Sequence, residues 1–156
     1  MIIFTGEYDC KVDAKWRIML PAAFRRQMGT VDLYSFVIKK DMYEPCLELY
    51  TVDEWERQNK MILKNIEPNN PEHRQLVRDF RMGATEVECD NTGRILLPSR
   101  LLRQADISKD VVLSGNIGKI EIWSPDLYYK SGGDLDAKRD RMQQIMGGVK
   151  YNLDDL

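Results

Sequence analysis

The chain has 156 residues, a length that fits one compact domain or two very small ones. Its 23 lysines and arginines and 25 aspartates and glutamates leave a net charge of −2, which argues mildly against a nucleic-acid partner. The three cysteines lack CxxC spacing, so we expect neither a disulfide framework nor a zinc site. No apolar run approaches the ~20 residues of a membrane span, so no membrane partner is expected and the cytoplasm is the expected location.

The first third of the chain predicts strands separated by a short helix. Apolar and charged side chains alternate over residues 7–13, which is typical of a half-buried strand, and a tight turn at 13–16 precedes the next strand. Pro21 suits the first position of a helix. The predicted elements are two strands, a helix and two more strands, over residues 7–13, 17–20, 21–28, 34–40 and 46–50.

Two helices are predicted in the connector that follows. Thr51 and Glu54 have the spacing of a capping box, in which each side chain bonds the backbone of the other, at the start of a helix over 52–66. Asn70 then caps a second helix that has Pro71 at its first position.

An internal repeat organises the chain. Residues 13–27 and 90–104 are identical at seven of fifteen positions, where unrelated segments would share about one. The second copy therefore predicts the same β-β-α-β-β order, with a helix over 98–105 and strands over 111–114 and 119–123. Trp16 occupies the position of Gly93, so the two turns are expected to differ in shape.

This repeat sets the domain plan. A copy of about 50 residues has a marginal core on its own, so we expect both copies to share one compact pseudo-symmetric unit. The predicted fold class is mixed β/α and mainly β. The predicted segments are a first repeat over 1–60, a helical connector over 61–82, a second repeat over 83–130, and a C-terminal helix (134–146) with a tail over 131–156.

Basic side chains gather in the repeated motif. Residues 11–26 hold five lysines and arginines against one aspartate, and residues 88–103 hold three arginines against two acidic residues. A basic motif in an otherwise acidic chain indicates an anion-binding face, although a solvated face without a partner remains an alternative.

Each copy places an aspartate four residues before an arginine: Asp13 with Arg17, and Asp90 with Arg94. Across a tight turn such a pair can form a salt bridge that only fixes the turn. Alternatively, the carboxylate orients the guanidinium toward a phosphate or toward the O6/N7 edge of guanine. Lys15 adds a charge suited to phosphate. Both interpretations can hold for one pair.

No arrangement of residues indicates an enzyme, and we expect no catalytic, cofactor-binding or metal-ligating residue. His73, the only histidine, lies in the middle of a predicted helix with no cysteine at motif spacing. The repeated Glu48 and Glu121 are expected to pair with a nearby arginine. Trp16 is compatible with stacking, with wedging or with simple packing.

The repeated motif resembles the MraZ family of bacterial transcriptional regulators, over residues 1–130. The residues that carry this resemblance are Asp13 and Arg17, Asp90 and Arg94, the Leu-Pro after each pair, Gly6-Glu7-Tyr8 and Glu121-Ile122-Trp123.

The resemblance implies a fold and a function. It implies an AbrB-like swapped-hairpin β-barrel, assembly into a ring-shaped homo-oligomer, and a nucleoid-associated regulator that binds double-stranded DNA. The implied sites are direct repeats upstream of the division and cell-wall gene cluster. The implied DNA contacts are Asp13, Lys15, Arg17, Asp90 and Arg94. Two departures are Trp16, where the family usually has glycine, and Thr92, where a lysine would add charge.

Two alternatives to DNA regulation follow from the same residues. An antitoxin-like swapped-hairpin protein would need a toxin partner. A non-DNA-binding assembly protein would use the Asp–Arg pairs to join subunits.

Overall fold

The computed structural model describes residues 1–29 and 35–149. It divides into two compact units, Met1–Pro125 and Asp126–Leu156. Tyr34, predicted to begin a strand, and residues 150–156 of the predicted tail lie outside the described residues. None of the helices within residues 1–29 and 35–149 has the length and hydropathy of a membrane-spanning segment.

Both copies follow the predicted β-β-α-β-β order, each with a helix after its last strand. The first copy contains β1 (Glu7–Lys11), β2 (Arg17–Met19), α1 (Ala22–Gln27), β3 (Ser35–Lys40) and β4 (Leu47–Thr51), followed by α2 (Val52–Asn65) and α3 (Pro71–Arg81). The second contains β5 (Thr85–Glu88), β6 (Arg94–Leu96), α4 (Ser99–Gln104), β7 (Asp110–Gly115) and β8 (Lys119–Trp123), followed by α5 (Pro125–Lys130) and α6 (Leu135–Met146).

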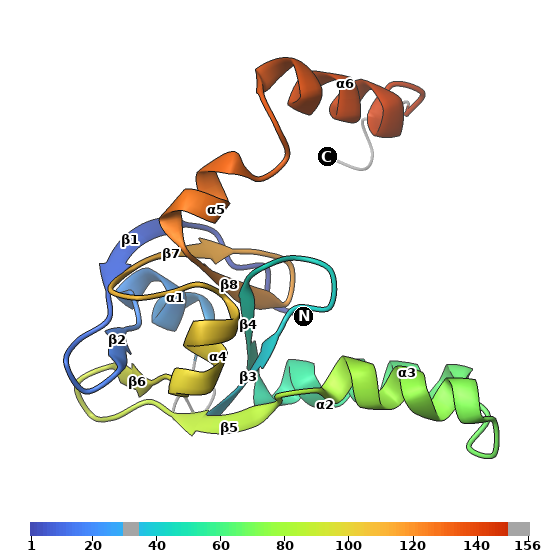
Figure 1. Ribbon diagram of the computed structural model, residues 1–156, viewed down its shortest axis with the longest axis horizontal. Coiled ribbons are helices and arrows are strands. Elements are labelled where there is room, and N and C mark those ends of the chain that lie inside the picture. The colour runs from blue at the N-terminus through green and yellow to red at the C-terminus, as the bar shows by residue number, and fades with distance from the viewer. Residues whose placement is uncertain (30–34, 150–156) are drawn as a thin grey trace. The chain divides into compact units, whose positions relative to one another are not determined.

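The two copies exchange strands (Figure 1). A six-stranded sheet has the order β1-β7-β8-β4-β3-β5, and β2 pairs with β6 in a separate ribbon. All pairings are antiparallel, and four of the six join different copies: β1–β7, β2–β6, β3–β5 and β4–β8. The order reads the same from either end when the copies are interchanged, so the arrangement is pseudo-twofold.

These pairings confirm a mixed β/α fold built on antiparallel sheet. A barrel would further require that the strands close into a continuous sheet. The described strands form two sheets, and none of their pairings closes a sheet on itself, so barrel closure stays a prediction.

The core lies between the ribbon and the inner face of the large sheet. Ile18 and Ile95 face each other across β2–β6 and are at most 1% exposed. Because side chains alternate along a strand, their neighbours in the ribbon face outward. Packed around the isoleucines are Leu20, Leu97, Phe24, Leu101, Ile38, Leu47, Leu113 and Ile122, all buried.

The connector helices begin as their sequences predict. The Thr51 side chain accepts from the amide of Glu54, and Asn70 caps α3. The other half of the predicted capping box is replaced, because the Glu54 carboxylate accepts from Arg57 and Gln58. The two helices lie side by side, with the Trp55 and Phe80 rings stacked at 5.5 Å between centroids. His73 has a structural role here, because its Nδ1 accepts a hydrogen bond (2.9 Å) from the backbone of Glu67 in the turn that joins the helices.

A buried charge cluster occupies the outer face of the large sheet. Glu48 and Glu121 stand directly opposite each other on β4 and β8, an arrangement that is unfavourable unless compensated. Glu48 lies 3.2 Å from Lys39 Nζ, contacts Lys119 and accepts from the Tyr50 hydroxyl at 2.6 Å. The partners are lysines, so the prediction of an arginine partner for Glu48 was wrong.

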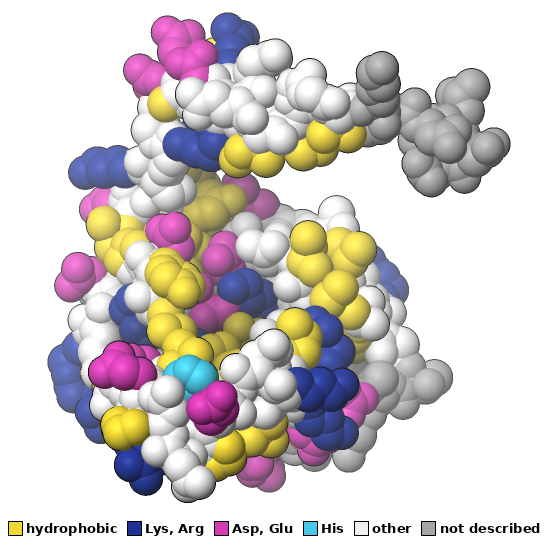
Figure 2. Space-filling model, turned by 90° about the vertical axis from the view of Figure 1, so that its right-hand side faces the viewer, with side chains coloured by type: hydrophobic (Ala, Val, Ile, Leu, Met, Phe, Trp, Pro, Cys, Tyr) yellow, Lys and Arg dark blue, Asp and Glu magenta, His cyan; other side chains and the backbone are white. Residues whose placement is uncertain are grey.

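The cluster borders a cavity of about 360 Å³ that is also lined by apolar residues, including Leu76 and Phe80 of α3. Figure 2 shows basic and acidic side chains gathered in a hollow near the single histidine, with hydrophobic side chains around them. Lys39 is only 1% exposed, so its charge depends on Glu48 for compensation.

Replacing Lys39 by methionine should therefore destabilise the fold by about 3 kcal/mol, because it removes one of the two lysines that compensate the buried carboxylate of Glu48. Denaturant unfolding measures the change. Lys60→Met makes the same substitution at an exposed position of α2 and should stay within about 0.5 kcal/mol of wild type. A loss below about 1 kcal/mol for Lys39→Met would show that Lys119 alone compensates Glu48.

Candidate nucleic-acid interface

The first turn is built around the carboxylate of Asp13. Its Oδ1 accepts from the amides of Lys15 and Arg17, both at 2.9 Å, and its Oδ2 lies 3.0 Å from Arg17 Nε. These bonds, led by the one from the Arg17 amide, hold the pKa of Asp13 below its usual value. The carboxylate thus orders the backbone and orients the guanidinium at once.

The second turn has the same backbone hydrogen bonds as the first, but its arginine interacts with the aspartate through a third side chain. Asp90 Oδ1 accepts from the amides of Thr92 and Arg94 (both 2.9 Å) and from the Thr92 hydroxyl (2.7 Å). Arg94 Nη1 donates to that hydroxyl at 2.9 Å, so Thr92 bridges the acid and the base. The Thr92 hydroxyl and the Arg94 amide lower the pKa of Asp90 to about 2.

The two turns have the same shape, contrary to expectation. Trp16 and Gly93 both adopt positive φ, 65° and 86°, and both donate to the preceding aspartate carbonyl at 3.0 Å. Glycine adopts this conformation freely, whereas a residue with a Cβ incurs a cost of about 1–2 kcal/mol. The backbone of Trp16 is therefore strained, although its side chain is 48% exposed.

The β2–β6 ribbon brings the turns together. The Leu20 amide donates to Gly93 O and the Leu97 amide donates to Trp16 O, both at 2.8 Å, so each turn is bonded to the end of the other copy's strand. Arg17 Nη1 also lies 3.9 Å from Asp90 Oδ2. The carboxylates of both copies therefore flank one guanidinium.

All five predicted residues lie in this ribbon and its two turns. Opposite the buried isoleucines, the outer face of the ribbon carries Arg17, Met19, Arg94 and Leu96. Arg17 is about one-third exposed at its side chain, and Lys15 is exposed in the first turn. The result is a narrow surface with two arginines, a lysine and two apolar side chains.

Two residues that sequence reasoning did not assign complete this surface. Thr92 mediates the Arg94 interaction, and Arg25 of α1 lies against the second turn. A Cβ atom added at Gly93 would lie 3.1 Å from Arg25 Nη1. The position equivalent to Arg25 in the second copy is the buried Leu102. This difference between the copies is the feature of the sequence that could have identified Arg25 as a surface residue of the site.

A possible cation site does not gain support from its surroundings. Asp41, Cys46 and Glu121 place one ligand atom each within 4.8 Å of one another. However, Lys119 Nζ already lies 3.8 Å from Asp41. Burial, followed by the charge of Glu121, raises the pKa of the Cys46 thiol, which keeps it protonated.

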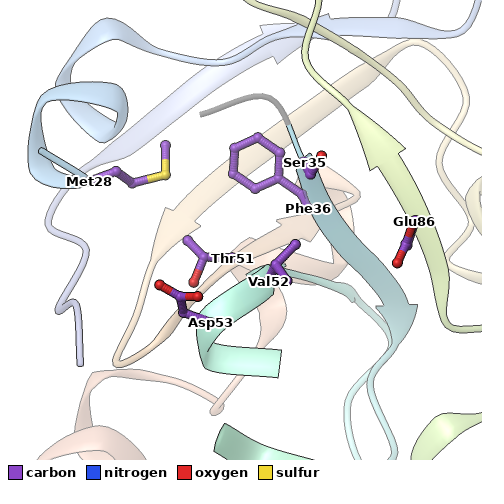
Figure 3. A pocket seen from close by; sticks show the side chains of 7 residues that line it. All are labelled: Met28, Ser35, Phe36, Thr51, Val52, Asp53 and Glu86. Atoms are coloured by element: carbon purple, nitrogen blue, oxygen red, sulfur yellow. The ribbon is translucent and has the colours of Figure 1, made fainter. Parts of the chain in front are cut away.

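The pocket in Figure 3 also lacks a catalytic arrangement in the part of the chain that is described. It encloses about 380 Å³ and is lined by Met28, Ser35, Phe36, Thr51, Val52, Asp53 and Glu86. The Thr51 hydroxyl accepts from the Glu54 amide as a helix cap, and the two carboxylates come from different elements, α2 and β5.

Strand exchange between two β-β-α-β-β copies, with an Asp–Arg turn from each on one ribbon, defines a class of tandem swapped-hairpin proteins. The family model described as "MraZ protein, putative antitoxin-like" matches residues 3–79 and again 80–143. The chain belongs to the MraZ family, which is a family of transcriptional regulators and not of enzymes.

Curated relatives agree along nearly the whole chain. A protein named Transcriptional regulator MraZ from Christiangramia forsetii is 37% identical over 97% of this chain and 98% of its own length. The protein of that name from Flavobacterium psychrophilum is 37% identical over 96% and 95%, and that from Lachnoclostridium phytofermentans is 39% identical over 92% and 97%.

The geometry of the second turn predicts how its backbone responds to mutation. Asp90→Ala removes the acceptor of three hydrogen bonds, so the amides of Thr92 and Arg94 should exchange with solvent faster by at least tenfold. Asp90→Asn keeps an acceptor oxygen and should protect both amides more than alanine does. Hydrogen-exchange NMR measures the effect, and equal exchange in the alanine variant and wild type would contradict this account.

The same turn sets a pH limit. Because the pKa of Asp90 is lowered to about 2, its stabilising contribution is complete above its ordinary pKa of about 4 and is lost as the pH falls through about 2. The turn should therefore stay intact between pH 5 and pH 8. Chemical shifts of the Thr92 and Arg94 amides, followed by NMR, should not titrate in that range.

Proposed function

We propose that the chain is a sequence-specific DNA-binding transcriptional regulator that contacts duplex DNA with the outer face of the β2–β6 ribbon. The observation that carries the proposal is the meeting of Asp13, Lys15, Arg17, Asp90 and Arg94 on one ribbon, although the two motifs are 77 residues apart. The relatives named transcriptional regulators support the same function.

Each residue has a distinct role in this proposal. Arg17 and Arg94 face the bases or phosphates, since a guanidinium fork fits the O6/N7 edge of guanine and the oxygens of a phosphate. Asp13 holds Arg17 directly, and Asp90 holds Arg94 through Thr92. Lys15 is exposed in the first turn and neutralises backbone phosphate.

The shape of the surface supports the same docking mode. A two-stranded ribbon fits the major groove of B-DNA, which is about 12 Å wide. The core side of this ribbon is fixed by Ile18 and Ile95, so its outer side chains project from a rigid base. Met19 and Leu96 lie between the arginines and offer apolar contact to base edges.

We further infer, from the family resemblance, the architecture and the site of action. The two sheets are taken as an AbrB-like barrel, and copies assemble into a ring that presents ribbons at regular spacing. Such a ring binds direct repeats upstream of the division and cell-wall gene cluster, in the nucleoid of the cytoplasm. Linked contacts raise affinity by roughly 10²–10⁴ without new interactions, which accommodates a chain whose net charge is −2.

Arg17→Ala should weaken binding to duplex carrying those direct repeats by about 1–3 kcal/mol for each ribbon engaged. Fluorescence anisotropy at several salt concentrations measures it, and circular dichroism checks the fold. Arg74→Ala removes an exposed arginine of α3, away from the ribbon, and should leave affinity unchanged. Equal affinity of Arg17→Ala and wild type would reject the DNA-contact assignment.

Native mass separates DNA binding from the assembly alternative. If the Asp–Arg pairs joined subunits, an Arg17→Ala/Arg94→Ala variant would lose its oligomer. We expect that variant to keep the oligomeric mass of wild type and to lose DNA. The antitoxin-like alternative, a word that the family description also uses, instead predicts a second small protein that co-purifies with the chain.

A further inference from the structure

The two ends of the ribbon differ although its backbone is pseudo-twofold. At the first turn stands Trp16, whose positive φ and shared turn hydrogen bond match those of Gly93. A glycine would form this turn with less strain. The indole therefore contributes something other than the turn itself, which makes its surroundings informative.

The indole does not belong to the core. Trp16 is 48% exposed and Leu96 is 56% exposed. Together with Val87 and Pro98 they line an open pocket of about 520 Å³, which the exposed Glu86 and Glu88 of β5 also line. Leu96 stands directly opposite Arg17 across the ribbon, so an apolar surface lies immediately beside the guanidinium.

The other end of the ribbon carries Arg25 and has glycine in place of the indole. Gly93 is buried, and a Cβ atom there would lie 3.1 Å from Arg25 Nη1 and 3.3 Å from Met19 Sδ. Arg25 Nε is buried and has no hydrogen-bond partner among the described residues. In the second copy the equivalent position is Leu102, which is 1% exposed and offers no charge to the first turn.

We propose that the ribbon is directional: Trp16 and Leu96 contact the 5-methyl group of a thymine next to the base that Arg17 reads, and Arg25 contacts phosphate at the opposite end. The inference rests on the proposed DNA-binding function and deepens it. The thymine methyl is the apolar group that base edges present in the major groove, so it is the chemical match for an exposed aromatic and aliphatic pair.

Directionality has a consequence for the DNA. A ribbon with identical ends would bind a site equally well in either orientation and would favour inverted repeats. A ribbon with the Trp16–Leu96 pair at one end and Arg25 at the other binds a single orientation better, so successive copies favour sites that repeat in the same direction.

The test uses full-length wild type, Trp16→Gly and Trp16→Phe. Wild type first selects duplexes from a random pool, and each thymine of the selected site is then replaced by deoxyuridine, which lacks only the methyl group. We expect wild type to lose about fourfold in affinity at one such position, the worth of one buried methyl group. Trp16→Gly should distinguish the two duplexes less than wild type does, because only Leu96 remains beside the methyl group, and Trp16→Phe should lie between Trp16→Gly and wild type.

Arg25→Leu is the matched variant for the other end, because it installs the residue of the second copy. It should lower the dependence of binding on salt and keep the deoxyuridine effect. Thermal melting controls the fold, and Trp16→Gly should melt no lower than wild type because the strain is relieved. A lower melting temperature would assign Trp16 to packing and overturn the proposal.

Two further outcomes distinguish failure of the proposed function from failure of the directional interface. If wild type selects no duplex at all, the proposed function fails and the inference fails with it. If wild type binds DNA but deoxyuridine has the same effect on wild type and on Trp16→Gly, the DNA-binding function stands and the directional interface is wrong.

Discussion

The pairing of β2 with β6 is the interaction on which the site depends. Each strand is three residues long and belongs to a different copy. Without the partner strand, neither Asp–Arg turn would have the backbone bonds that Leu20 and Leu97 donate to it. The surface is therefore a product of strand exchange, and a single copy could present only half of it.

Local rules account for most of the secondary structure. The capping pattern at Thr51 and the cap at Asn70 place two helices correctly, because these side chains bond amides that a helix leaves unpaired. The Asp13–Arg17 spacing likewise predicted a direct ion pair, since it depends only on one turn. Strand exchange came from the resemblance, because periodicity identifies a strand but not its partner.

The unpredicted features are long-range or depend on side-chain rotamers. Arg94 has the same spacing from its aspartate as Arg17, but its guanidinium bonds the Thr92 hydroxyl, which in turn bonds Asp90. The spacing alone does not predict whether the hydroxyl or the guanidinium will bond the carboxylate. Arg25 approaches Gly93 from another element. The exchange of Gly93 for Trp16 predicted turns of different shape, yet Trp16 has a positive φ and its carbonyl accepts from the Leu97 amide of the partner strand.

How far two equivalent residues differ depends on their distance from the pseudo-twofold axis that relates the copies. Ile18 and Ile95 pack against each other there, so a change in one alters the contact of its equivalent, and both positions hold the same residue. Farther out, equivalent positions meet different neighbours: Lys39 faces Glu48, whereas Ser114 faces Glu121. Packing at the axis thus constrains the copies to match, and asymmetry is permitted at the turns, where it bears on what the ribbon contacts.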